Sequence, residues 1–160
     1  MKQTVKMQEI QNRLGPGKIT RDGFLGKDRR KLVDILTEDD SEVKRLGYDH
    51  TAIAGKMKYF RDTGEKGLGD FIDISPYFSV SVETFRGKLP CPFECRKILP
   101  KSITTVKNKR LGRELVFSDI QIHLIMYHGF YQGKQSQYRI EPRDLIDILE
   151  VEKPENKSEI

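Results

Sequence analysis

The chain has 160 residues, of which 36% are hydrophobic and 33% are charged, with a net charge of +5. This length is typical of one domain, and the composition excludes a disordered chain and an integral membrane protein. The most apolar window, residues 120–131, is much shorter than the roughly 20 residues that a membrane-spanning helix needs.

The start of the chain carries positive charge but no apolar stretch, so the sequence predicts no secretory signal. In a protein without such a signal, the two cysteines are expected to be free thiols or metal ligands and not a disulfide. We therefore expect a cytoplasmic protein in which residues 1–160 form a single domain.

The first part of the chain has the pattern of short helices. Residues 1–25 are expected to form an N-terminal arm with one short helix, because Gly15-Pro16-Gly17 interrupts any longer one. Residues 26–64 are expected to form a helical portion, in which apolar residues recur at helical spacing. Three helices are predicted there: Asp28–Leu36, a second from the N-cap Thr37 to Leu46, and a third from the N-cap Asp49 to near Gly64.

Residues 70–150 have the pattern of a strand-rich α+β portion. Polar and apolar residues alternate over Tyr77–Phe85, as in a half-buried strand. The β-rich stretches Ser102–Lys107 and Glu114–Phe117 flank a glycine-containing loop of hairpin length, Asn108–Gly112. One more short strand is predicted near Tyr138–Ile140.

Two helices are predicted in the same portion of the chain. Ser118 and Gln121 have the spacing of a capping box and Gly129 ends the pattern, which predicts a helix over Asp119–His128. Its apolar residues surround most of the circumference, so this helix should be buried. A last helix is expected from Pro142, followed by a polar tail at residues 151–160.

The predicted fold class is therefore α+β. The helical N-terminal portion is expected to pack with a small antiparallel sheet, and the buried helix near residues 119–128 is expected to cover one face of that sheet.

Two cysteines and two histidines form the most specific pattern in the sequence. Cys91-x3-Cys95 is followed, after a 27-residue interval, by His123-x4-His128. Thiolate and imidazole are ligands that Zn(II) prefers, so these four residues predict a structural zinc site. The set resembles a Cys2His2 zinc finger in its ligands and in both short spacings. Its long interval exceeds the roughly 12 to 15 residues of a finger, which excludes a simple ββα finger.

Helical geometry also allows an interpretation in which the four residues bind no metal. Five residues at about 100° each place His123 and His128 about 140° apart on a regular helix, so the two side chains do not share a face. They can still converge if the last turn unwinds at Gly129. In the alternative, His123 is a hydrogen-bonded core residue, His128 meets the negative end of the helix dipole, and both cysteines are small hydrophobic residues.

Positive charge is concentrated between the middle strands, where Glu94 alone opposes nine cations. Such a group can neutralise phosphates while nearby aromatic side chains, among them Phe85, Phe93, Tyr131 and Tyr138, stack on exposed bases. The alternative is a solvated sheet edge on which lysines prevent pairing with other strands. The nine cations, here called the basic ribbon, are Arg86, Lys88, Arg96, Lys97, Lys101, Lys107, Lys109, Arg110 and Arg113.

These patterns favour a small non-enzymatic binding protein that uses the basic ribbon on an anionic partner, most simply nucleic acid. The first alternative is a protein-interaction module that meets an acidic protein surface, with a structural zinc or without one. The second is a metal-dependent hydrolase with Cys91 or a histidine in catalysis. No hydrolase motif flanks these residues, and a zinc with four protein ligands lacks the open position that catalysis needs.

Overall fold

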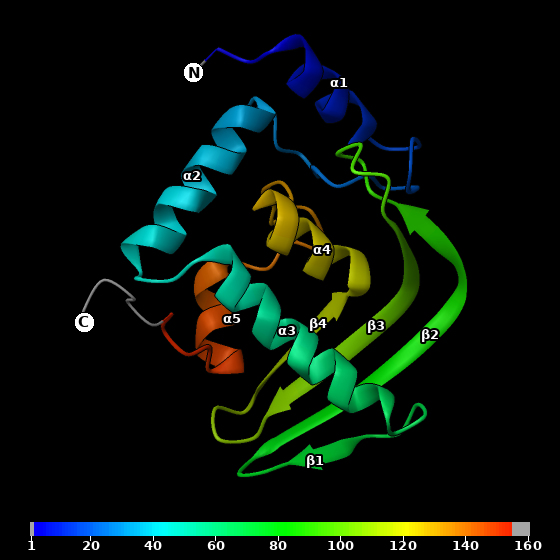
Figure 1. Ribbon diagram of the computed structural model, residues 1–160, viewed down its shortest axis with the longest axis vertical. Coiled ribbons are helices and arrows are strands. Elements are labelled where there is room, and N and C mark those ends of the chain that lie inside the picture. The colour runs from blue at the N-terminus through cyan, green and yellow to red at the C-terminus, as the bar shows by residue number, and fades with distance from the viewer. Residues whose placement is uncertain (1, 155–160) are drawn as a thin grey trace.

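The computed structural model describes residues 2–154, which contain five helices and one four-stranded antiparallel sheet (Figure 1). The predicted α+β fold class is confirmed. In chain order the elements are α1 (Val5–Arg13), α2 (Leu32–Arg45), α3 (His50–Glu65), β1 (Ile72–Ile74), β2 (Phe78–Pro90), β3 (Ile98–Asn108), β4 (Arg113–Ser118), α4 (Asp119–His128) and α5 (Pro142–Leu149).

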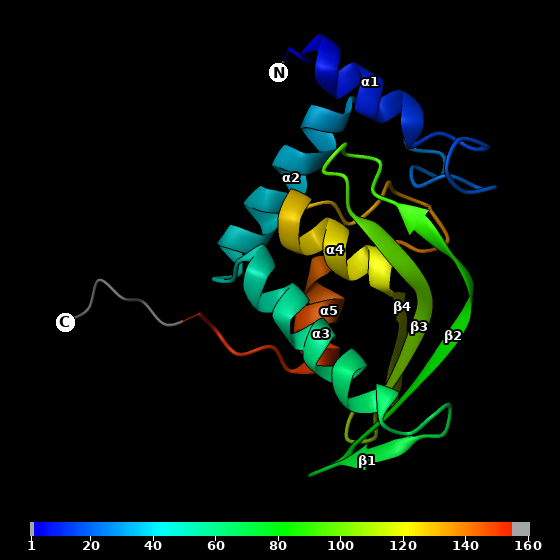
Figure 2. The same cartoon turned by 45° about the vertical axis from the view of Figure 1, so that its right-hand side comes forward.

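The sheet has the order β1-β2-β3-β4, and every neighbouring pair is antiparallel. Its two long central strands pair from Phe78 with Asn108 to Pro90 with Ile98, with an irregularity between Phe85 and Lys88. Figure 2 shows α3, α4 and α5 on the same side of the sheet. None of the helices in residues 2–154 combines the length and hydropathy that a bilayer crossing requires.

Two hydrophobic clusters form the core, and α4 lies between them. Ile122 and Ile125 of α4 pack in the cluster that fills the space between the sheet and the helices α3 and α5. Ile120 and Leu124, which lie on another side of α4, pack in a second cluster with residues of α1 and α2. The helix is buried, as the sequence predicts, and it is apolar around most of its circumference because it lies between these two cores.

Local capping signals set the ends of three helices where they are expected. The side chain of Ser118 accepts a hydrogen bond from the amide of Gln121, and the Gln121 side chain accepts one from the Ser118 amide, which completes the capping box of α4. Asp49 accepts a hydrogen bond from the Ala52 amide at 2.7 Å and begins α3. Pro142 opens α5. A glycine in the left-handed conformation, Gly129, follows α4.

Three of the predicted elements differ from the structure. Thr37 does not cap a second helix, because its hydroxyl donates to the Val33 carbonyl at 2.7 Å within the single continuous helix α2. Residues 138–140 form no strand; Tyr138 ends a turn, and Arg139 and Ile140 lie in the irregular segment before α5. Val151, which the sequence assigns to the polar tail, is buried in the core. The rest of that predicted tail, from residue 155 onward, lies outside the described residues.

A buried ion pair explains both of the first two differences. Asp39 continues the buried face of α2 beyond Thr37, and its carboxylate accepts two hydrogen bonds from the Arg139 guanidinium, at 2.8 and 3.0 Å. The side chains of the two residues are only 7% and 6% exposed. Arg139 also donates to the carbonyl of Gln132 at 2.8 Å. This pair joins α2 to the segment before α5. The segment is held by the ion pair and not by the pairing of a strand.

Replacement of Arg139 by methionine should lower the free energy of unfolding by about 3–5 kcal/mol, because Asp39 would remain buried without a partner. Urea denaturation of both proteins measures the difference. Arg143→Met, which changes an exposed arginine of α5, is the control and should cost less than about 0.5 kcal/mol. A loss for Arg139→Met as small as that of the control would contradict a stabilising role of the pair.

Candidate metal centre

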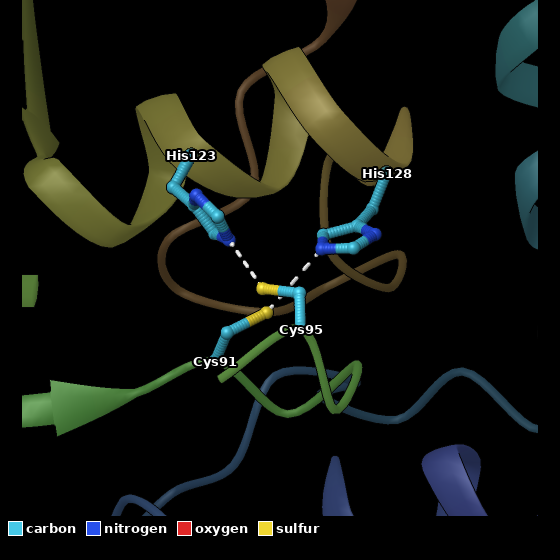
Figure 3. A group of neighbouring side chains, drawn as sticks. All are labelled: Cys91, Cys95, His123 and His128. Carbon is cyan, nitrogen blue, oxygen red and sulfur yellow. Dashed lines mark hydrogen bonds between the residues drawn. The ribbon is translucent and has the colours of Figure 1, made fainter. Parts of the chain in front are cut away.

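The two cysteines lie in the loop that joins β2 to β3, and the two histidines project from α4 toward that loop (Figure 3). Cys91 directly follows β2, and Cys95 lies three residues before β3. His123 is in the middle of α4 and His128 is its last residue. The structure thus brings together all four residues that the sequence singles out as metal ligands.

The ligand atoms lie close to the separations that a tetrahedral metal site requires. The Cys91 sulfur lies 3.4 Å from Nε2 of His128, and the Cys95 sulfur lies 3.1 Å from Nε2 of His123. All four atoms lie within 4.8 Å of one another. With Zn–S bonds near 2.3 Å and Zn–N bonds near 2.05 Å, tetrahedral ligand atoms are about 3.3 to 3.8 Å apart. A shift of about 1 Å in the widest pair is enough to reach this geometry.

The histidines converge although the helix does not unwind. The amide of Gly129 donates to the carbonyl of Ile125 at 3.1 Å, so the last turn of α4 keeps its helical hydrogen bond. The convergence that the sequence allows through an unwound last turn is therefore reached without unwinding. Figure 3 shows the reason: the cysteine loop lies beneath α4, and the two imidazoles reach down toward the two sulfurs, which lie between them.

Hydrogen bonds hold the cysteine loop in a closed turn. The Cys91 amide donates to the Lys97 carbonyl at 2.8 Å, and the Phe93 amide donates to the Cys91 sulfur at 3.4 Å. Glu94 and Arg96 flank Cys95 with positive φ angles of 63° and 62°, so the backbone turns sharply on both sides of this cysteine. These bonds and turns direct both sulfurs toward the same point below α4.

Arg13 fastens the loop to the N-terminal arm. Its Nε donates to the Pro92 carbonyl at 2.9 Å, and its guanidinium forms an ion pair with Glu94 at 2.7 Å. The role of Arg13 could not be predicted from the sequence, because 78 positions separate Arg13 from Cys91 and only the packing of α1 brings them together. The arm that the sequence describes as a separate segment is thus a support of the candidate site.

The aromatic side chain of Phe93 covers His128, one of the two candidate histidine ligands. The Phe93 ring stacks on the His128 ring, with centroids 4.4 Å apart and planes inclined by 10°. Phe130 packs against Phe93 from the core, with centroids 5.5 Å apart. Phe93 is therefore held against a candidate ligand and is not one of the exposed aromatic residues expected near the basic ribbon.

Burial acts on the protonation of the candidate ligands. It raises the pKa of the Cys91 thiol to about 11, and it lowers the pKa of His128 to about 4. The pKa of His123 is lowered by burial and by the nearby Lys97 charge. Both imidazoles are therefore neutral at pH 7, the form in which they bind metals, and a bound cation would favour the thiolate form of the cysteines.

The basic ribbon divides into two groups at opposite ends of β3. Lys101 and Lys107 lie six residues apart on this strand, or about 20 Å. Lys101 belongs to a group near the cysteines, here called the loop-end cations, and Lys107 belongs to a group at the β3–β4 hairpin, here called the hairpin-end cations. The loop-end cations are Arg86, Lys88, Arg96, Lys97 and Lys101, and the hairpin-end cations are Lys107, Lys109, Arg110 and Arg113.

The two groups differ in their partners. Three hairpin-end cations form ion pairs: Lys109 with Asp73 at 3.2 Å, Arg110 with Glu150 at 2.7 Å, and Arg113 with Asp144 at 3.3 Å. The fourth, Lys107, lies over the ring of Phe71. None of the loop-end cations forms an ion pair with an acid of residues 2–154. The five loop-end cations thus have no acidic partner among residues 2–154, whereas three of the four hairpin-end cations do.

The aromatic residues expected near these cations also divide into two kinds. Phe85 and Tyr138 are 54% and 49% exposed, so their rings can contact a partner. Tyr131 is buried, and its hydroxyl hydrogen-bonds to Nδ1 of His50 at 2.8 Å.

Comparison of the chain with protein-family models, with curated proteins and with solved structures gives no match.

Protein prepared without chelators should contain one metal ion per chain, measured by elemental analysis of the purified protein. His123→Gln should lose most of this metal because one of four ligands is removed. His50→Gln is the matched control, since His50 is the one histidine of the chain outside the cluster and its variant should keep the ion. A wild-type protein without stoichiometric metal would contradict the site.

Proposed function

We propose that this protein is a non-enzymatic binding protein in which a structural zinc ion orders the β2–β3 loop and the loop-end cations bind nucleic acid. The observation that carries the proposal is the convergence of two sulfurs and two imidazole nitrogens within 4.8 Å at the end of the sheet where the unpaired cations lie. The two parts of the proposal rest on different residues and can be tested separately.

The donor set favours zinc over other common metals. Magnesium and calcium prefer oxygen ligands, and the cluster has none, whereas two thiolates and two imidazoles suit tetrahedral Zn(II). Four protein ligands also fill the coordination shell. A zinc bound in this way has no position for water or substrate, which supports a structural role over a hydrolytic one.

A zinc ion at this position would connect parts of the chain that are distant in sequence. Its ligands come from the β2–β3 loop and from α4, and Cys91 belongs to the second hydrophobic cluster with residues of α1 and α2. Binding energy of such an ion contributes to folding, because the unfolded chain holds no preformed site. A thiolate site of this kind persists in a reducing compartment, which agrees with the proposed cytoplasmic location.

Nucleic acid is the partner that the free cations suit best. Arg96 and Lys97 lie on the cysteine loop itself, and Arg86, Lys88 and Lys101 lie on the adjoining ends of β2 and β3. A zinc ion that orders the loop would thus also hold Arg96 and Lys97 in position relative to the three strand cations. Fixed cations lose less conformational entropy on binding phosphates than cations on a loose loop.

Titration of a labelled single-stranded oligonucleotide at several salt concentrations should show binding that weakens as salt rises. Each neutralised phosphate of a single strand contributes about −0.7 to the slope of log K against log salt. The triple variant Arg86→Glu, Lys88→Glu and Arg96→Glu should weaken binding and make the slope shallower by about 2, since three phosphate contacts are lost.

The matched control reverses three hairpin-end charges, in the variant Lys109→Glu, Arg110→Glu and Arg113→Glu. Both triple variants change the net charge by the same amount, but the control residues already have acidic partners. The control should therefore lose less affinity than the loop-end variant. Equal losses in the two variants would mean that overall charge and not the loop-end group determines binding, and a wild-type protein that does not bind would refute the proposal.

A further inference from the structure

A pocket of about 350 Å³ lies at the loop end of the sheet, where Ser118 and Ile120 at the N-terminal end of α4 also line it. It is bordered by the ends of β2 and β3, by the loop after α1 and by the loop before α5, and Figure 2 shows these two loops beside the arrowhead of β2. Its volume falls within the range of about 300–1,000 Å³ that small-molecule sites occupy.

The walls of this pocket are mainly apolar and include two exposed aromatic rings. Phe85 comes from β2 and Tyr138 from the loop before α5, and both rings are about half exposed. Leu89 and Ile103 complete the apolar wall on the sheet side. Exposed aromatic side chains at a concave surface are typical of sites that stack on flat ligands.

Two cations without acidic partners stand in the lining of the same pocket. Lys101 is one of the loop-end cations and Arg21 comes from the loop after α1. Neither forms an ion pair with an acid of residues 2–154. Asp22 is the acid in the lining, and its carboxylate accepts a hydrogen bond from Gln137 at 3.4 Å. The lining therefore has an excess of positive charge and complements an anionic ligand.

A buried amide adds a polar group to the apolar wall. Gln132 is 3% exposed and lines the pocket. Its Oε1 accepts a hydrogen bond from the Ser136 hydroxyl at 2.9 Å, whereas its Nε2 has no partner among the described residues. An amide nitrogen in this position can donate to a carbonyl or ring nitrogen of a heterocycle.

We infer that this pocket receives one unstacked base of a single-stranded nucleic acid, with Phe85 and Tyr138 against the base and Lys101 and Arg21 on the adjoining phosphates. The inference rests on the proposed nucleic-acid binding and names its substrate class. A base within a duplex is stacked and paired and cannot enter such a pocket, so the protein should prefer single strands to duplexes.

Paired substitutions of the two rings test the pocket without removing charge. In Phe85→Leu with Tyr138→Leu the apolar character of the wall is kept but the stacking surface is lost. Affinity for a single-stranded oligonucleotide should fall by about tenfold or more, as loss of base stacking predicts. The salt slope should stay that of the wild type, because no phosphate contact changes.

Tyr59→Leu is the matched control, since Tyr59 is similarly exposed but lies on α3, outside the pocket lining. This variant should bind as the wild type does. An oligonucleotide that contains 5-iodouracil adds a direct readout, because this base crosslinks under light to aromatic side chains on which it stacks. Adducts on Phe85 or Tyr138 are expected.

The possible outcomes distinguish failure of the pocket inference from failure of the proposed function. Wild-type affinity in the double leucine variant, equal affinity for duplex and single strand, or crosslinks only at other residues would each overturn the pocket while leaving salt-dependent binding intact. A wild-type protein that binds neither single strands nor duplexes would overturn both.

Discussion

Burial of α4 between two hydrophobic clusters is the constraint on which the rest of the structure depends. Ile122 and Ile125 contact the core beneath the sheet, and Ile120 and Leu124 contact the core shared with α1 and α2. Packing on several sides fixes the rotation of the helix about its axis, because any turn would remove apolar surface from one of the clusters. The rotation that satisfies both clusters is also the one that directs His123 and His128 toward the cysteine loop.

The candidate metal centre would link the cysteine loop to α4, in addition to the packing and hydrogen bonds that already hold the loop. The cysteine loop is closed on itself by the Cys91 amide, held to α1 through Arg13, and covered at its histidine end by Phe93. The site consists of neutral imidazoles and two cysteine sulfurs. Its net charge is low while the thiols are protonated, and two thiolates would balance the charge of a divalent cation. The same loop lies beside the loop-end cations, and the pocket lies at the same end of the sheet, so the order of this loop bears on both proposed contacts with nucleic acid.

Features encoded by neighbouring residues could be predicted from the sequence, and features that depend on distant contacts could not. The capping box at Ser118 and the N-cap Asp49 act within one turn, so the ends of α4 and α3 follow from the residues themselves. The four candidate ligands could be chosen by residue type and short spacing. Their convergence could not, because the 27-residue interval contains β3, β4 and the hairpin between them. Likewise, α2 continues past Thr37 because Asp39 pairs with Arg139, 100 positions away.

X-ray absorption spectroscopy of the protein purified without chelators tests the central claim most directly, since it reports both the metal and its ligand atoms. The account predicts zinc with two sulfur ligands near 2.3 Å and two nitrogen ligands at about 2.0–2.1 Å. A zinc shell made mainly of oxygen, or one that lacks sulfur, would contradict the assignment of Cys91, Cys95, His123 and His128 as its ligands.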